Sequence, residues 1–267
     1  MYAKDFTYDG TTLSSLGYTL CSFGDERDAA MGSKISFSTV AVNKGERYLL
    51  ADYKYDECLT TTLQICKNPC NIGSQNNLKI SPSEISTLSR WLNKKSFRQM
   101  KFDATGWTDV IFEASFNISA IEVGGDIYGL ELEMVTNRPF AVKSPVAKVM
   151  VFTEANQTQS FTDDSDEIGY IYPASVSVTC GLSGTLTLVW NMENRTTAVG
   201  NCTTNEVITF TYPTLASSNS SHTTLVDDFN FVFPRVANTA ASRTNYVTAS
   251  MPCTVVITYS PIVKVAL

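Results

Sequence analysis

Three residues in the second half of the chain have the types and spacing that could bind a sugar. Trp190 is followed by Glu193 and Arg195 in the segment Trp-Asn-Met-Glu-Asn-Arg. An indole ring can stack on the apolar face of a sugar, and a charged pair can hold its hydroxyl oxygens. The same pattern fits a strand that ends at a buried tryptophan and continues into a polar turn, which is the simpler interpretation.

The Trp-x-x-Glu-x-Arg spacing resembles that of galectins, in which the ring stacks on a galactose face and the charged pair grips hydroxyl groups. The His, Asn and Arg strand motif that precedes it in galectins is absent from this sequence. Trp190, Glu193 and Arg195 are therefore carbohydrate-binding candidates that carry only part of that family's site.

Catalytic chemistry has few candidates in this chain. His222 is the single histidine, and it lies in a Ser-rich stretch where a solvated loop is expected. One histidine removes most schemes based on a catalytic triad or a histidine-bound metal. The acidic segment at 163–167 lacks the glycine and the distant glutamate of an EF-hand, so we expect a solvated loop there. We predict no catalytic residue, no metal site, no cofactor and hence no enzyme.

Seven cysteines are spread over the chain. Cys58, Cys66 and Cys70 lie close together in sequence, which leaves a zinc site or a disulfide in this loop as alternatives. A structural zinc site needs four ligands, and the fourth would have to come from a distant part of the chain. An odd number of cysteines, in a chain long enough to bury a core, favours free thiols.

The composition indicates a folded protein with a weakly charged surface. Of the 267 residues, 43% are hydrophobic and 17% are charged, with a net charge of −6. The aromatic content contradicts the signature of disorder, and an acidic chain without a basic run is unsuited to binding nucleic-acid phosphates. No apolar stretch approaches the roughly 20 residues of a transmembrane helix, and the first ten residues are polar. We expect no membrane or specific nucleic-acid partner, and a protein made and folded in a cytoplasm.

One helix is predicted near residues 82–93. Ser81 supplies an N-cap hydroxyl, Pro82 takes the first helical position and Glu84 the third, which is the sequence of a capping box. Apolar residues then recur at spacings of three and four and form one stripe, which we expect to pack on a sheet: Ile85, Leu88, Trp91 and Leu92.

Strand patterns dominate the rest of the first half. Residues 35–42 alternate apolar and polar side chains, which predicts a strand with one face on a core. A turn at 43–45 and a partner strand at 48–55 follow. The clearest alternation begins after the hairpin turn at 124–126, where residues 128, 130, 132 and 134 are apolar and residues 131 and 133 are glutamates.

A change in composition near residue 140 marks a predicted domain boundary. Residues 1–139 hold 31 charged residues, whereas residues 140–267 hold 15 and are rich in Ser and Thr. At least six short strand patterns without helical periodicity follow, which favours a β-sandwich or a jelly roll. We predict a mainly β protein, with a β-rich domain and one short helix at 1–139 and an all-β domain at 140–267. Whether the last strand, near 255–259, packs back on the first domain stays open.

The order of these elements resembles the distal tail protein (Dit) family of long-tailed, non-contractile phages that infect mainly Gram-positive bacteria. Five groups of segments carry the resemblance: Asp-Phe-Thr-Tyr-Asp-Gly at 5–10 with Leu-Gly at 16–17, Ser-Arg-Trp-Leu at 89–92, Leu-Glu-Leu-Glu at 130–133 running into Arg-Pro-Phe at 138–140, Tyr-Pro at 172–173, and Val-Val-Ile-Thr-Tyr-Ser-Pro at 255–261. None of them is a catalytic motif, so the resemblance depends on their order and spacing.

This resemblance implies a structural part of a virion, located at the tail tip or baseplate and assembled in the cytoplasm of the bacterial host. In that family the N-terminal β-rich domain forms a hexameric ring, which joins the major tail protein of the tail tube to the tail-associated hub protein or lysin. A galectin-like β-sandwich faces outward and serves in some phages as a platform for receptor-binding proteins. The alternative is a carbohydrate-binding module or lectin that recognises cell-surface glycans through the Trp190 segment.

Overall fold

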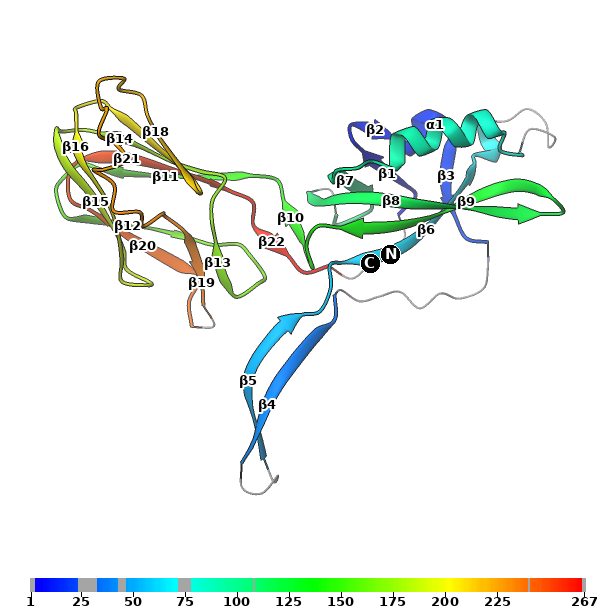
Figure 1. Cartoon of the computed structure of the whole chain (residues 1–267), viewed down its shortest axis with the longest axis horizontal. Helices are drawn as coiled ribbons and strands as arrows, with labels where there is room; N and C mark the ends of the chain where they lie inside the picture. Colours follow the sequence, from blue (N-terminus) through cyan, green and yellow to red (C-terminus); the bar gives the residue numbers. More distant parts are fainter. Residues whose placement is uncertain are drawn as a thin grey trace. The chain divides into compact units, whose positions relative to one another are not determined.

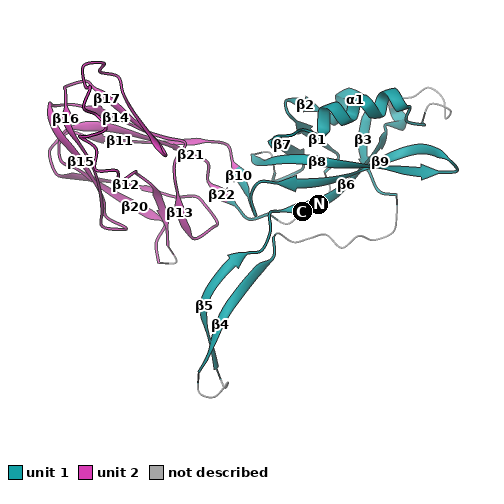
Figure 2. Ribbon diagram, in the orientation of Figure 1, with its two compact units in different colours: residues 1–142, 263–267 teal, residues 143–262 magenta. Residues whose placement is uncertain are grey.

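The structure is a computed structural model, and it describes residues 3–23, 33–42, 47–71, 78–107, 109–239 and 241–265. The chain divides into two compact units, residues 1–142 with 263–267 and residues 143–262 (Figure 2). Each unit has its own hydrophobic core. The turn predicted at 43–45 lies outside the described residues. The described part is mainly β with one α-helix, which confirms the predicted fold class.

The first unit is built on a nine-stranded sheet of order β2-β1-β7-β8-β9-β6-β3, with β10 beside β8 and β22 beside β10 (Figure 1). The elements of this unit are β1 (Asp5–Tyr8), β2 (Thr11–Thr12), η1 (Leu13–Leu16), β3 (Tyr18–Cys21), β4 (Ile35–Val42), β5 (Arg47–Tyr55), β6 (Thr60–Lys67), η3 (Pro69–Asn71), α1 (Pro82–Leu92), β7 (Arg98–Asp103), β8 (Val110–Val123), β9 (Asp126–Thr136), β10 (Ala141–Lys143) and β22 (Ile262–Val263).

Helix α1 begins with the predicted capping box, in which Ser81 and Glu84 satisfy each other's backbone N–H groups. Its stripe faces the core: Leu88 and Leu92 are buried, and Ile85 and Trp91 pack against the same cluster. The Trp91 ring stacks on Phe6 of β1 with ring centroids 5.8 Å apart. Its Nε1 also donates a hydrogen bond of 3.0 Å to the Tyr8 carbonyl oxygen, so the helix is fixed to the sheet.

Strands β8 and β9 form a long hairpin at the centre of the sheet. Its turn is Gly124-Gly125, where φ angles of 63° and 87° favour glycine. Along β9 the alternation predicted from the sequence is present: Leu130, Leu132 and Met134 are at most 1% exposed in the core. The intervening Glu131 and Glu133 accept hydrogen bonds from amide side chains on neighbouring strands.

Strands β4 and β5 pair with each other and with no other described strand, and they extend away from the nine-stranded sheet (Figure 1). The sequence predicts a core under one face of β4, and this prediction is wrong for the isolated chain. Phe37 and Val40 on β4 and Tyr48 on β5 are all more than half exposed. The alternating pattern correctly indicates a two-faced strand, but no described part of the chain covers either face.

The second unit is a β-sandwich. One sheet has the order β11-β21-β14-β17-β18, the other has the order β12-β20-β15-β16, and a separate pair joins β13 and β19. Its strands are β11 (Val146–Phe152), β12 (Gln157–Thr162), β13 (Gly169–Ile171), β14 (Ser175–Cys180), β15 (Gly184–Trp190), β16 (Arg195–Cys202), β17 (Val207–Thr211), β18 (Thr214–Ser217), β19 (Val236–Asn238), β20 (Thr244–Ala249) and β21 (Cys253–Tyr259).

The two sheets of the sandwich face each other through alternate residues of their strands, such as Val178 of β14, Leu188 of β15 and Ile257 of β21, which are all fully buried. The strand whose position the sequence leaves open, near 255–259, is β21. It lies between β11 and β14 inside this unit. The short β22 that follows pairs with β10 in the nine-stranded sheet.

Candidate interaction surfaces

The β4–β5 hairpin has two chemically different faces. Directly paired residues of antiparallel strands lie on the same face, so the register assigns each side chain to one face. One face, which we call the apolar hairpin face, carries no charged residue: Ile35, Phe37, Thr39, Ala41, Tyr48, Leu50, Tyr53 and Tyr55. The opposite hairpin face carries both signs of charge: Ser36, Ser38, Val40, Val42, Arg47, Leu49, Asp52 and Lys54.

A β-bulge keeps the apolar hairpin face continuous. The register passes from Ser38↔Asp52 to Thr39↔Leu50, so Ala51 is an extra residue on β5. Because side chains alternate along a strand, Tyr48 and Leu50 would otherwise point away from Tyr53. The extra residue brings the apolar side chains of both halves of β5 to the same face.

This face is open to solvent over most of its length. Its four large side chains on the outer part of the hairpin are between 47% and 64% exposed: Phe37, Tyr48, Leu50 and Tyr53. Near the base, Tyr55 makes an edge-to-face contact with Phe140, with ring centroids 6.3 Å apart. A two-stranded sheet alone is marginally stable in water, and an exposed apolar face of this size is typical of an interaction surface, so the apolar hairpin face is a candidate for one.

The predicted sugar-binding residues are brought together only in part. The Trp190 ring, at the end of β15, is 4% exposed and packs in the sandwich core, where Nε1 donates a hydrogen bond of 3.1 Å to Thr197 Oγ1. A buried ring cannot stack on a sugar, so the structure corrects the prediction for this residue.

Glu193 and Arg195 do lie near each other, but a third residue dominates their contacts. Glu193 Oε2 accepts hydrogen bonds from Arg235 Nε at 2.6 Å and pairs with Arg235 Nη2 at 2.5 Å. Arg195 Nε is farther away, at 3.6 Å, and Arg195 Nη2 donates to the Phe233 carbonyl oxygen. The sequence offered no local signal for Arg235, which is 42 residues from Glu193.

His222 is not in a solvated loop, contrary to the prediction. Its side chain is 2% exposed, with Nδ1 2.6 Å from Glu206 Oε1 and Nε2 3.1 Å from Asp228 Oδ2. Burial lowers the pKa of His222, but the two carboxylates outweigh this effect and the pKa is raised. Both ring nitrogens are engaged by carboxylates, so this cluster fixes the 219–228 segment to the sandwich and leaves no nitrogen for acid–base catalysis.

The pKa of Glu206 is lowered to about 2. Its burial acts in the opposite direction, but hydrogen bonds from Ser217, His222 and Thr203 to the carboxylate prevail. The carboxylate is therefore ionised over the whole physiological range, and its negative charge beside the imidazole favours the protonated form of His222.

The acidic segment at 163–167 is also less solvated than predicted. Asp163 and Ser165 are buried, and Ser165 Oγ donates a hydrogen bond of 2.8 Å to Asp163 Oδ1. All seven cysteines are free thiols, and the described residues contain no group of three His, Cys, Asp or Glu side chains arranged to hold a metal ion. No described helix is long and apolar enough to cross a membrane.

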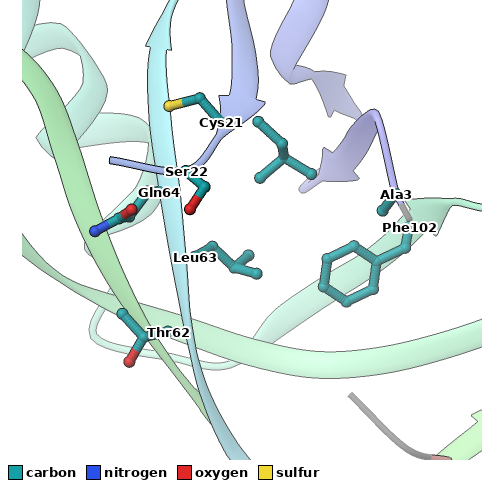
Figure 3. A pocket seen from close by; sticks show the side chains of 8 residues that line it. Ala3, Cys21, Ser22, Thr62, Leu63, Gln64 and Phe102 are labelled. Atoms are coloured by element: carbon teal, nitrogen blue, oxygen red, sulfur yellow. The ribbon is translucent and has the colours of Figure 1, made fainter. Parts of the chain in front are cut away.

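A small pocket of about 170 Å³ opens in the first unit, lined by residues that include Cys21, Gln64 and Phe102 (Figure 3). Burial and the neighbouring Cys66 thiol raise the pKa of Cys21, so its thiol stays protonated and is a poor nucleophile. The Gln64 amide is already used, because Oε1 accepts from the Phe23 N–H and Nε2 donates to Glu131. The described lining offers no acid–base pair.

Two family models match nearly the whole chain. Residues 1–138 match the model described as a phage tail protein N-terminal domain, and residues 144–259 match the one described as a phage tail C-terminal domain. No curated protein matches the chain.

A solved structure supports the same relationship at the level of the fold. The crystal structure of the Dit protein of phage SPP1 is similar to this chain with a TM-score of 0.66 and 11% sequence identity, over 96% of this chain and 98% of that one. That protein is described as a paradigm of the hub adsorption apparatus in phages that infect Gram-positive bacteria. The likeness confirms the Dit-like fold predicted from the sequence.

Proposed function

Because this chain belongs to the phage tail protein family, we propose that six copies of it form a ring at the tip of a phage tail. The ring joins the major tail protein of the tail tube to the tail-associated hub protein or lysin. The second unit offers a platform for receptor-binding proteins. The protein is a virion component assembled in the cytoplasm of the host bacterium, and its role is structural, not enzymatic.

The observation that carries this proposal is the apolar hairpin face. It extends from the first unit with four large apolar side chains in solvent and no described residue of the chain to cover them. A protrusion on one copy that docks on a different surface of the next copy makes a head-to-tail contact. Such contacts close into a ring when the rotation between copies allows it.

The free energies of burial and association favour a closed ring over a dimer. Fully burying one large apolar side chain contributes about 1.5–3 kcal/mol, so covering four that are about half exposed contributes about 3–6 kcal/mol per hairpin. Association of two proteins costs about 4–15 kcal/mol in lost freedom of motion. One hairpin contact therefore holds two copies weakly, whereas ring closure gives every copy two such contacts.

The test is the oligomeric state of the full chain, measured by light scattering and negative-stain electron microscopy. We expect six-fold rings for the natural sequence and monomers for the double substitution Phe37→Asp with Leu50→Asp on the apolar hairpin face. The matched control is Val40→Asp with Leu49→Asp, which places the same two charges on the opposite hairpin face. A natural protein that stays monomeric at high concentration, or rings that survive the first substitution, would overturn the proposal.

A further inference from the structure

Three exposed tyrosines of the sandwich lie near one another, since Tyr172 stacks on Tyr212 and Arg235 interacts with both Tyr170 and Tyr172. Tyr170, Tyr172 and Tyr212, which we call the tyrosine platform, are between 41% and 55% exposed. Tyr172 and Tyr212 come from chain segments 40 residues apart, yet their rings stack with centroids 4.1 Å apart and planes inclined by 19°. Exposed aromatic rings on a protein surface mark a place where a ligand can replace water.

Neighbouring side chains hold these rings in place. The Arg235 guanidinium lies 3.8 Å from the centre of the Tyr170 ring and is itself fixed by Glu193. The Tyr212 and Phe233 rings make a T-shaped contact with centroids 5.4 Å apart. Because these contacts already hold the rings in place, binding a ligand on them costs little side-chain entropy.

The size of the platform favours a small ligand over a protein. A tyrosine side chain can bury about 150–250 Å², so the three rings together leave about 300 Å² open. A stable protein interface needs about 800 Å² from each partner. An area of about 300 Å² suits a few sugar rings.

The charges beside the platform define the ligand further. Arg195 and Arg235 share the single carboxylate of Glu193, which leaves one positive charge in excess next to the tyrosines. Arg195 is 29% exposed at its side chain, so its donors can reach a hydroxyl or an anionic group. This environment suits a neutral or anionic ligand and disfavours a cationic one.

We propose that the tyrosine platform binds a glycan, with pyranose rings stacked on the tyrosines and Arg195 donating hydrogen bonds to hydroxyl or acidic groups of the sugar. The polar half of the Trp-x-x-Glu-x-Arg segment then takes part in binding, but the stacking rings come from Tyr170, Tyr172 and Tyr212 in place of the buried Trp190. This site lies wholly within the second unit and does not depend on ring assembly.

The experiment is an array of neutral and anionic pyranose oligosaccharides probed with the full chain, followed by titration of the strongest ligand. We expect binding that falls at least tenfold in Tyr170→Ala with Tyr212→Ala and survives in Tyr170→Phe with Tyr212→Phe, because the ring carries the contact. The matched control is Tyr246→Ala, which removes an exposed tyrosine of β20 in the same unit.

Three results would overturn this inference. They are the absence of binding to any array glycan at millimolar concentration, glycan binding that the double alanine variant retains, and a double alanine variant that loses a protein partner while no glycan binds. Electron microscopy of the same variants separates this inference from the ring proposal, since rings should form equally well with or without the platform.

Discussion

Strand β9 and the β4–β5 hairpin carry the same alternation of apolar and polar residues, yet their apolar side chains end in opposite environments. On β9, the Leu132 side chain is fully buried in the core of the first unit. On β5, the Leu50 side chain is 57% exposed. Both strands belong to the same unit. An alternating pattern therefore identifies which face of a strand must be covered, and it does not identify whether the same chain or another one covers it.

The largest loss in the free energy of unfolding is expected for the buried face of strand β9. Leu132→Ala should lower the free energy of unfolding by about 2–5 kcal/mol, because it removes buried methyl groups and leaves a cavity in the core. Urea unfolding followed by tryptophan fluorescence measures this change. A loss below about 1 kcal/mol would mean that β9 is not packed as the comparison requires.

The buried Glu206 and His222 of the sandwich should make the free energy of unfolding depend on pH. The contribution of Glu206 to stability is present above about pH 4.5 and is lost as the pH falls toward its folded pKa of about 2. The contribution of His222, whose pKa is raised, is complete below about pH 6.5 and is lost as the pH rises through the raised value. The free energy of unfolding should therefore decrease on both sides of this range.

His222→Gln is the variant that isolates the alkaline decrease, since the chain has no other histidine. Unfolding measured from pH 5 to 9 should become nearly independent of pH above 6.5 in this variant. An unchanged alkaline decrease would show that the imidazole between Glu206 and Asp228 is not its source.

A smaller loss in the free energy of unfolding is expected at the start of α1. The contacts there are local, so assembly should not change them. Ser81→Ala removes the hydroxyl that accepts from the Glu84 N–H, and should cost about 1 kcal/mol. Ser86→Ala, an exposed serine of the same helix that is not part of the cap, is the control. Equal losses for the two substitutions would argue against the capping box.

The smallest change in the free energy of unfolding is expected for the exposed strand β5. Leu50→Ala is the same substitution as Leu132→Ala, but it should change the free energy of unfolding of the dissociated protein by less than about 0.5 kcal/mol. Its cost should instead be seen in ring assembly, as a higher concentration required for half-assembly. A large loss of monomer stability would place a core under the hairpin after all.

Local patterns were sufficient for much of the fold. The capping box and apolar stripe specify α1, and Gly124-Gly125 specifies the β8–β9 turn, because each depends on residues a few positions apart. The environments of Trp190 and His222 depend on residues from distant segments, such as Thr197, Glu206 and Asp228, and single-chain periodicity does not report such contacts.

The tyrosine platform likewise depends on contacts between distant segments of the chain. Tyr172 and Tyr212 each precede a proline, which marks two turns, but nothing in the sequence indicates that the two turns meet. The partial galectin-like spacing includes Glu193 and Arg195, which lie beside the proposed platform, whereas its Trp190 ring is buried. A sugar-binding role for Glu193 and Arg195 stays a prediction, and nothing in the local sequence indicates the tyrosine rings.

Hydrogen–deuterium exchange of the β4–β5 hairpin tests the central claim most directly, because it reports whether another copy covers these strands. The full chain is compared at a concentration where it is assembled and at one where it is dissociated. We predict that the amides of residues 35–42 and 47–55 exchange rapidly in the dissociated protein and become strongly protected on assembly, while those of β9 are protected in both. Equal exchange of the hairpin in both states would contradict the account.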